Sequence, residues 1–527
     1  MQKKKIIDVM DTSFRDGFQS VFGARVLIDD FLPALKKGVD IGIRHFEFGG
    51  GARFQSCVFY LNEDPFEMMD KFRAAIGPEL STQTLSRGIN TVALDSSPRD
   101  VIELHAKMFK KHGTTVIRNF DALNDVNNLI YSGQMIHKHG LQHEVVVTMM
   151  ELPPGCEGAH DVPFYEKTLR GILDAGIPYH SVCFKDASGT SSPQKVYDTI
   201  KMARKLLPEG THIRLHTHET AGVSIACYLA ALEAGADGID LACSPVSGGT
   251  SQPDMIVMLH ALKGKPFDLG LDIEKVREYE DVIKDTLKDY FIPPEATQVS
   301  PEIPFSPMPG GALTANTQMM RDFKVLDKFP GVIRAMREVV ERGGFATSVT
   351  PVSQFYFQQA FNNVMKGPWE DIADGYGRMV LGYFGKTPVP PDPKLVDLIS
   401  KKMNLPVTTE NPVDIAEKDP KKGIPHWTKI LEENKLPTTE ENIFVAVSCQ
   451  EKGIAFLQGK GKVNVRKLSD EKPAAPTTAQ PAAPKSAASP GAPATLSNMG
   501  SASLAKPATY KLKIENQSYF VEVEQLG

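Results

Sequence analysis

Short apolar runs alternate with amphipathic segments of helical period from residue 5 to about residue 265. The segments between the runs, such as DPFEMMDKFRAAI and PQKVYDTIKMARKLL, place apolar residues at helical spacing, and several follow Pro, Ser or Asp. Eight strand–helix units of roughly 30 residues each predict an α/β fold in which residues 1–265 form a closed (β/α)8 TIM barrel. An open doubly wound sheet is the alternative, but eight regular units favour closure. The predicted strands begin near Ile6, His45, Leu80, Thr115, His143, Tyr179, His212 and Gly238.

The alternation stops near residue 266. From 266 to 468, helical patterns are separated by Pro/Gly-rich turns such as PFSPMPGG, which predicts a mostly helical C-terminal domain packed against the mouth of the barrel. The clearest helical patterns cover residues 273–290, 329–342, 355–364 and 393–403.

The last part of the chain has a different composition. Residues 469–508 are rich in Pro, Ala, Ser and Thr, and such a segment buries too little apolar surface to offset the entropy of ordering, so we predict a flexible linker. Residues 509–527 alternate like a β-hairpin. Because a lone hairpin is at best marginally stable, we expect the start of a small, incomplete β domain, tethered by a linker that lets it move.

Composition excludes several classes of protein. The 527 residues are 41% hydrophobic and 23% charged, with a net charge of −5 and no basic stripe, which argues against a nucleic-acid partner. No apolar run approaches the ~20 residues of a membrane span, and the start, MQKKKIID, has no apolar signal region behind its lysines. The six cysteines are scattered without a CxxC pair, as in a reduced, cytoplasmic protein.

Candidate metal ligands fall at the ends of predicted strands. Asp16 follows the first strand beside the fixed cation Arg15, and His216 and His218 are two residues apart, which places them on the same face of the seventh strand. Lys185 ends the sixth strand. Because an ammonium repels a cation, this lysine is either modified to an anion or points away.

Arg118, near the end of the fourth strand, is a fork donor suited to a substrate carboxylate, and Gln19 could complete such a clamp. The structural alternative is a salt bridge from Arg118 to Asp121 or Asp125. Arg15 is a further candidate for binding an anionic substrate. Neither GxGxxG nor GxxxxGK[ST] occurs, which disfavours a nucleotide-binding enzyme.

As a set, seven segments resemble a known family. RDGFQS, IRNFDALND, FKDASG, LHTHETAG, SGGTSQP, MPGGALT and VTPVSQ occur in the order found in biotin-dependent carboxyltransferases. That family comprises the carboxyltransferase part of pyruvate carboxylase, the alpha subunit of oxaloacetate decarboxylase and the pyruvate-acting transcarboxylase subunit. The resemblance covers roughly residues 5–465.

The resemblance implies a divalent metal, zinc in the first instance with cobalt or manganese as alternatives, held by Asp16, a carbamylated Lys185, His216 and His218. It implies that Arg118 and Gln19 hold the keto-acid carboxylate. Thr314, in MPGGALT, matches the threonine that shuttles a proton between the keto acid and biotin, a relay that suits a group able to donate and accept.

The same resemblance implies partners. Residues 509–527 resemble the opening strands of a biotinyl domain, but the biotin-accepting AMKM motif is absent, so the carrier is not complete in this chain. We therefore expect a carboxybiotin domain, a biotin carboxylase subunit or membrane decarboxylase subunits, and a homo-oligomer. The chain is expected in the cytoplasm, or at the inner membrane through such subunits.

Departures from the family concern the substrate. Phe18 replaces a common histidine, Arg53 and Gln55 replace a threonine and an aspartate near the pocket, and Asp125 stands where pyruvate carboxylases carry tyrosine. An added cation at Arg53 leaves 2-oxoglutarate, or another acceptor with a second carboxylate, open beside pyruvate and oxaloacetate.

Two other interpretations of the protein's function remain. Aldol-type synthases and lyases, such as isopropylmalate synthase and hydroxymethylglutaryl-CoA lyase, share the RDG segment and the strand HxH. Lys185 before Asp186, MPGGALT and the long linker favour the biotin family instead. A non-enzymatic barrel scaffold is disfavoured because several polar ligand residues converge at one barrel end.

Overall fold

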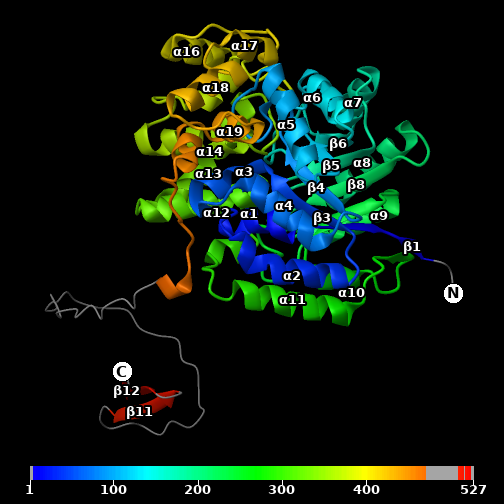
Figure 1. The fold of residues 1–527 in the computed structure, drawn as a ribbon, viewed down its shortest axis with the longest axis vertical. Helices are drawn as coiled ribbons and strands as arrows, with labels where there is room; N and C mark the ends of the chain where they lie inside the picture. Colours follow the sequence, from blue (N-terminus) through cyan, green and yellow to red (C-terminus); the bar gives the residue numbers. More distant parts are fainter. Residues whose placement is uncertain (1–3, 471–507, 515–516, 524–527) are drawn as a thin grey trace, which may run out of the picture. The chain divides into compact units, whose positions relative to one another are not determined.

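Eight parallel strands close into a barrel in sequence order, and helices surround it (Figure 1). The computed structural model describes residues 4–470, 508–514 and 517–523. The predicted closed α/β barrel is thus confirmed, and the open sheet is wrong. The strands are β2 (Asp8–Asp11), β3 (His45–Gly50), β4 (Ser81–Ser86), β5 (Val116–Asn119), β6 (Gln142–Thr148), β7 (Ser181–Asp186), β8 (His212–Thr217) and β9 (Gly238–Leu241).

Strand β2 closes the barrel because it pairs with β3 on one edge and with β9 on the other. The strand register also brings two candidate metal ligands together, because Lys185 lies opposite His216 in the β7–β8 pair. The carboxyl ends of all eight strands meet at one mouth, which is where enzymes of this fold carry their sites.

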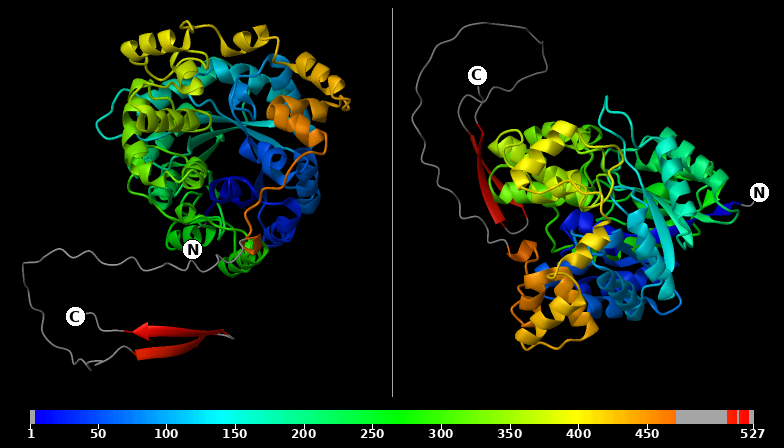
Figure 2. Two further views of the ribbon diagram at one scale, coloured as in Figure 1. Left: turned by 90° about the vertical axis from the view of Figure 1, so that its left-hand side faces the viewer. Right: turned by 90° about the horizontal axis from the view of Figure 1, so that it is seen from above.

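Helices cover the outside of the barrel, with the strands at the centre of the ring (Figure 2, left). Several begin where the sequence supplies caps: Asp64 accepts the backbone N–H of Phe66 and Glu67, and Ser192 accepts that of Lys195, each ahead of a proline at the first turn. The barrel helices are α2 (Ile28–Asp40), α4 (Pro65–Ile76), α5 (Arg99–Lys111), α6 (Asn127–Lys138), α7 (Val162–Asp174), α8 (Pro193–Leu206), α9 (Ser224–Ala234), α10 (Met255–Ala261) and α11 (Ile273–Leu287).

Helix α11 follows residue 265 in the chain yet belongs spatially to the barrel. It packs against α2, and Tyr279 donates a 2.6 Å hydrogen bond to the carboxylate of Asp11 at the end of β2. A short parallel pair, β1 (Lys5–Ile6) with β10 (Phe267–Asp268), lies before it. The chain up to about Glu471 forms one compact unit.

The C-terminal helices pack on the barrel in two places. Apolar residues of α12–α16 form one buried cluster with side chains of the barrel, among them Leu85, Phe120 and Val146. Helix α19 instead packs on the flank, where the Phe444 ring lies 5.3 Å from that of Phe54 in α3 (Gly51–Ser56). The helices are α12 (Gly310–Asp322), α13 (Phe329–Arg342), α14 (Val352–Lys366), α15 (Asp374–Val380), α16 (Pro393–Met403), α17 (Pro412–Lys418), α18 (Ile424–Glu433) and α19 (Glu440–Leu457).

The predicted hairpin is confirmed: β11 (Ala508–Ile514) and β12 (Gln517–Val523) pair antiparallel. Nearly all of the predicted linker, residues 471–507 of 469–508, lies outside the described residues. Among the helices that the structure describes, none combines the length and the apolar character that crossing a bilayer requires.

Candidate functional site

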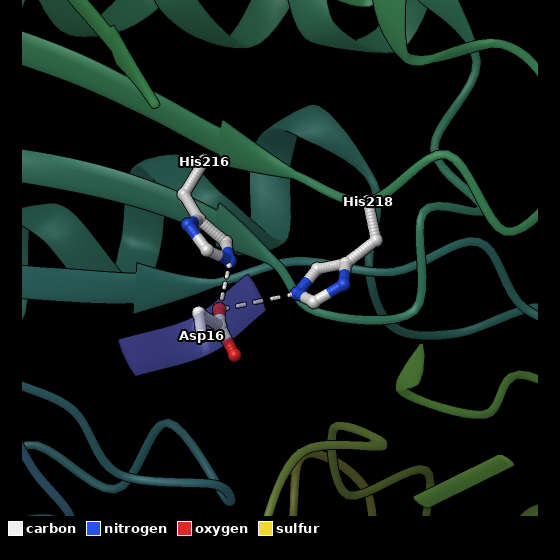
Figure 3. A group of neighbouring side chains, drawn as sticks. All are labelled: Asp16, His216 and His218. Atoms are coloured by element: carbon white, nitrogen blue, oxygen red, sulfur yellow. Dashed lines mark ion pairs between the residues drawn. The ribbon is translucent and has the colours of Figure 1, made fainter. Parts of the chain in front are cut away.

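One carboxylate oxygen is the centre of a polar cluster at the barrel mouth. Asp16 Oδ2 lies 3.3 Å from His216 Nε2 and 3.4 Å from His218 Nε2 (Figure 3). Lys185 Nζ lies 3.9 Å from the same oxygen. All four side chains are buried. The structure therefore places the four residues proposed from the sequence as metal ligands close together, in one buried cluster.

The local structure that presents Asp16 differs from the prediction. Strand β2 ends at Asp11, and Asp16 stands on a π-helical turn, Ser13–Gly17, that continues into the short helix α1 (Phe18–Phe22). Such turns are rare and recur at functional sites. From this turn the Asp16 carboxylate reaches both imidazoles at the end of β8.

The donor set fits a small divalent cation. The ligand atoms of Asp16, His216 and His218 all lie within 4.8 Å of one another, and imidazole nitrogen with carboxylate oxygen is a typical zinc environment. His216 Nε2 has no hydrogen-bond partner in the described part of the chain. The amide nitrogen of Gln252, 3.0 Å from both Asp16 Oδ2 and His218 Nε2, was not foreseen from the sequence.

Burial and neighbouring charges keep Asp16 and His216 in the protonation states that metal binding requires. Burial alone would raise the pKa of Asp16, but Arg15 and His218 hold it well below its usual range. Burial, with Lys185 nearby, lowers the pKa of His216 to about 4, so its imidazole is neutral near pH 7. Burial also lowers the pKa of Lys185; Asp16 opposes this shift, and Arg118 and Arg15 add to it.

The imidazoles are oriented by different partners. His216 Nδ1 lies 2.7 Å from a carboxylate oxygen of Asp240, and His218 Nδ1 lies 2.7 Å from the backbone oxygen of Thr250. Burial would raise the pKa of Asp240, but Arg118, the hydrogen bond from His216 and Arg214 hold it well below its usual range.

Arg15 and Gln19 line the mouth as predicted, but the charge of Arg15 is already balanced. Its guanidinium pairs with buried Glu47, lies 3.3 Å from Asp16 Oδ1 and donates a 3.1 Å hydrogen bond to Gln19 Oε1. Arg15 therefore serves first to hold Asp16 and Gln19 in place.

Arg118 does not occupy the position expected of a substrate clamp. It is fully buried in the barrel interior, 2.5 Å from Glu144 Oε1 and 2.5 Å from Asp240 Oδ2, and it is not among the residues lining the mouth cavity. The salt bridges expected to Asp121 or Asp125 are also wrong. Its Nη2 has no hydrogen-bond partner in the described part of the chain, but two carboxylates already balance the charge of the guanidinium.

Arg53 is directed away from the cavity as well. Its Nη1 donates to the backbone oxygens of Ala24 and Val26, at 2.8 and 2.6 Å, and its guanidinium lies over the ring of Phe31. This arrangement fixes the connection between α1 and α2. Its position does not support the expected contact with a second substrate carboxylate.

The sequence reasoning missed Arg87, which lies at the mouth and pairs with no carboxylate among the described residues. Its Nη1 donates to the backbone oxygens of Val92 and Ala93, and its Nε has no partner in the described part of the chain. Burial, together with Arg15, lowers the pKa of Arg87 to about 9. The available signal was its place directly after β4, at a strand end like the other site residues.

A small cavity of about 30 Å³ joins these residues. Besides the metal-site cluster it is closed by the start of α12, where Gly310 approaches the loop after β9: a Cβ there would lie 1.6 Å from the backbone oxygen of Thr250. Only glycine fits that contact, which explains the first glycine of the PGG segment. The polar lining residues include Arg15, Asp16, Gln19, Arg87, Lys185 and His218.

Thr314 lies one turn further along α12, on the wall of a second, larger cavity of about 630 Å³. Its hydroxyl donates a 2.6 Å hydrogen bond to the backbone oxygen of Ser20 and lies 3.4 Å from Thr250 Oγ1. Aromatic and amide side chains line this cavity, including Phe22, Tyr60, Asn316, Gln318 and Phe357. Helices α1 and α12 contribute residues to both cavities.

Two domain families match the chain: a conserved carboxylase domain over residues 303–522, and an HMGL-like domain over residues 149–283. A pyruvate carboxylase subunit of Methanocaldococcus jannaschii is 30% identical over 463 residues, covering 87% of this chain and 78% of that protein. The methylmalonyl-CoA carboxyltransferase 5S subunit of Propionibacterium freudenreichii is 29% identical, covering 80% and 81%.

Two further comparisons extend the set. The 2-oxoglutarate carboxylase large subunit of Hydrogenobacter thermophilus is 28% identical, covering 88% of this chain and 70% of that protein. The carboxyl transferase domain of Rhizobium etli pyruvate carboxylase, solved with pyruvate and biocytin, superposes with a TM-score of 0.78 at 24% identity, covering 86% and 78%. At that identity the superposition establishes the fold.

Proposed function

The chain belongs to the biotin-dependent carboxyltransferase family and is an enzyme of that class, and we propose that it moves a carboxyl group between carboxybiotin and a 2-oxo acid, pyruvate or oxaloacetate. The observation that carries this proposal is the convergence of Asp16, Lys185, His216 and His218 beside the guanidinium of Arg87. The guanidinium can bind a substrate carboxylate, and a metal held by the four neighbouring residues can bind a carbonyl oxygen. A 2-oxo acid carries both groups.

Asp16, His216, His218 and a carbamylated Lys185 would hold a divalent metal, with zinc as the first candidate. Carbamylation requires a neutral amine, and the lowered pKa of Lys185 supports it. When bound, the metal supplies positive charge that stabilises an enolate oxygen. The protein contributes burial, which strengthens that interaction, and a fixed arrangement of its donors.

Arg87 and Gln19 take the role of carboxylate clamp that the sequence assigned to Arg118 and Gln19. Arg87 is the better candidate because it lines the cavity without an acidic partner in the described part of the chain, while Arg118 is neutralised by Glu144 and Asp240. Arg15 supports the clamp through its hydrogen bond to Gln19.

Thr314 would relay a proton between the two substrates. In carboxylation, the hydroxyl accepts the methyl proton of pyruvate while its own proton passes to the ureido nitrogen of biotin. The carboxyl group leaves that nitrogen as CO2, and the new enolate carbon bonds to it. The position of Thr314 on the wall of the 630 Å³ cavity supports this role, with biotin entering through that cavity.

Partners follow from the same proposal. Biotin would arrive on a carrier domain whose first strands correspond to the hairpin β11–β12, tethered by the 469–508 segment, and the carboxylase-domain match extends into this hairpin. Because one relative is named as a single subunit of a pyruvate carboxylase, a biotin carboxylase subunit is the expected partner; membrane decarboxylase subunits are the alternative. A homo-oligomer and a cytoplasmic location complete the proposal.

A second acceptor, 2-oxoglutarate, stays open because one relative is named a 2-oxoglutarate carboxylase large subunit. The position of Arg53 no longer supports it, since that side chain binds backbone oxygens outside the cavity.

The test is biotin-stimulated decarboxylation of oxaloacetate by the full chain, with free biotin as acceptor. We expect pyruvate formation that depends on biotin, is lost in Thr314→Ala and is largely retained in Thr314→Ser, which keeps the hydroxyl. Parallel assays with 2-oxoglutarate as a carboxyl acceptor settle substrate choice. Acyl-CoA condensation without any biotin-dependent exchange would contradict the proposal in favour of the aldol-type class.

A further inference from the structure

The barrel interior beneath the mouth contains a buried ion-pair network that reaches one of the imidazoles. Asp240, on β9, places Oδ2 2.7 Å from His216 Nδ1 and 2.5 Å from Arg118 Nη1. Its other oxygen lies 3.0 Å from Arg214 Nη1. Asp240, His216 and Arg118 are 0% exposed, so water does not weaken these contacts.

Arg118 and Arg214 are held in turn by further carboxylates. Arg118 Nε lies 2.5 Å from Glu144, and Arg214 pairs with Asp8 at the opposite end of the barrel. The network is therefore braced by strands β2, β5, β6, β8 and β9 at once, and the Asp240 carboxylate cannot rotate without breaking at least one ion pair.

This geometry decides which nitrogen of His216 is available. Two groups lie near Nδ1: the Asp240 carboxylate at 2.7 Å and Arg118 Nη1 at 3.3 Å. The much shorter contact is to an acceptor, so Nδ1 donates its proton to Asp240, and Nε2 keeps its lone pair. Nε2 is the atom that lies 3.3 Å from Asp16. A carboxylate behind an imidazole also makes the ring a stronger donor to a metal than a neutral acceptor does. His218 has only the neutral backbone oxygen of Thr250 in the equivalent place.

Building on the proposed metal site, we propose that Asp240 is a positioning residue that fixes the tautomer and orientation of His216, and that Arg118 and Arg214 act by holding Asp240 in place. Arg118 thus helps to orient the metal ligand His216 through Asp240 and does not contact the substrate. The two imidazoles then contribute unequally, with His216 the stronger and more rigid donor.

The test compares metal affinity in Asp240→Asn with that of the unmodified chain, by competition of Zn²⁺ against a chelator. The amide keeps the size of the side chain but removes its charge, and we expect about 10- to 100-fold weaker zinc binding. Thermal unfolding of the metal-free proteins is measured in parallel, because a general loss of structure would lower both the zinc affinity and the melting temperature.

Two further variants separate positioning from structural damage. Glu144→Gln removes a buried carboxylate from the same network without touching His216, and we expect zinc affinity within about threefold of the unmodified chain. Asp240→Glu keeps a carboxylate that can accept from His216 Nδ1, so it should bind zinc more tightly than Asp240→Asn does.

The outcomes are distinct. If the unmodified chain binds no zinc, the proposed metal site fails. If it binds zinc and Asp240→Asn binds with unchanged affinity, the positioning role alone is overturned. Equal losses of zinc affinity in Asp240→Asn and Glu144→Gln would also overturn it, because the effect would then follow from the network's stability.

Discussion

The two ends of the barrel carry the same residue types in different settings. At the mouth, Asp16 meets His216 and His218. At the base, Asp8 Oδ2 lies 3.3 Å from His212 Nε2 and 3.6 Å from His45 Nδ1, nearly the same distances as at the mouth. On composition alone either end would be a metal-site candidate.

What differs is the cation already present and the exposure. At the base, Arg214 donates to Asp8 and lies 3.3 Å from His45 Nδ1, so a permanent charge occupies the centre. The Asp8 side chain is 43% exposed, whereas that of Asp16 is 7% exposed. At the mouth, the guanidinium of Arg15 lies on the other carboxylate oxygen, 3.3 Å from Asp16 Oδ1, and is paired with Glu47. The cation 3.9 Å from Asp16 Oδ2 is the amine of Lys185, which can lose its charge while a guanidinium cannot.

A carboxylate between two histidines is therefore not sufficient for a metal site. At the base, the arginine makes the cluster a structural ion pair that closes the barrel and braces the interior network. At the mouth, burial and a neutralisable lysine leave lone pairs available.

The largest effect is expected from removing the proposed metal ligands at the mouth. His216→Ala or Asp16→Asn should lower zinc affinity by on the order of 100-fold or more and abolish carboxyl transfer, because each removes a direct donor. His45→Ala, the matched change at the base, should leave the zinc content unchanged. Elemental analysis of the purified proteins measures both. Zinc lost equally from the His45 variant would erase the contrast.

A smaller effect concerns the guanidiniums. Arg87→Met should raise the KM for the keto acid by roughly 10- to 100-fold, since a charged hydrogen bond contributes about 1.5–3 kcal/mol. Arg53→Met, which removes an equally buried arginine outside the cavity, should lower the melting temperature and leave KM unchanged. Steady-state kinetics with calorimetry distinguish the two. A rise in KM for the Arg53 variant alone would restore its predicted substrate role.

The smallest effect lies at the base. Burial would raise the pKa of Asp8, but Arg214, with His212 and His45, holds it well below its ordinary value of 3.8. A lowered pKa adds stability above pH 3.8 that is lost as pH falls through the folded-state value. Asp8→Asn should therefore cost about 1 kcal/mol at pH 7, discounted for exposure, and less at about pH 3. Urea unfolding at both pH values measures it; a penalty that grows in acid would contradict the assignment.

Much of the fold could be predicted from the sequence because it rests on local patterns. Eight apolar runs at regular spacing specified the barrel, and the helices over 329–342 and 393–403 begin and end where their patterns do. The strand HxH and Lys185 were identified because residues at strand ends of a parallel barrel meet at one mouth.

The roles of the arginines were decided only by the tertiary structure. Arg15, Arg53, Arg87 and Arg118 are all buried cations near strand ends, and no local pattern distinguishes them. Their partners lie far away in sequence: Arg118 pairs with Asp240, 122 positions on, whereas Arg87 donates to backbone oxygens and, among the described residues, pairs with no acid. An ion pair depends on which charges the closed barrel brings within reach, and the spacing of residues along the chain does not contain that information.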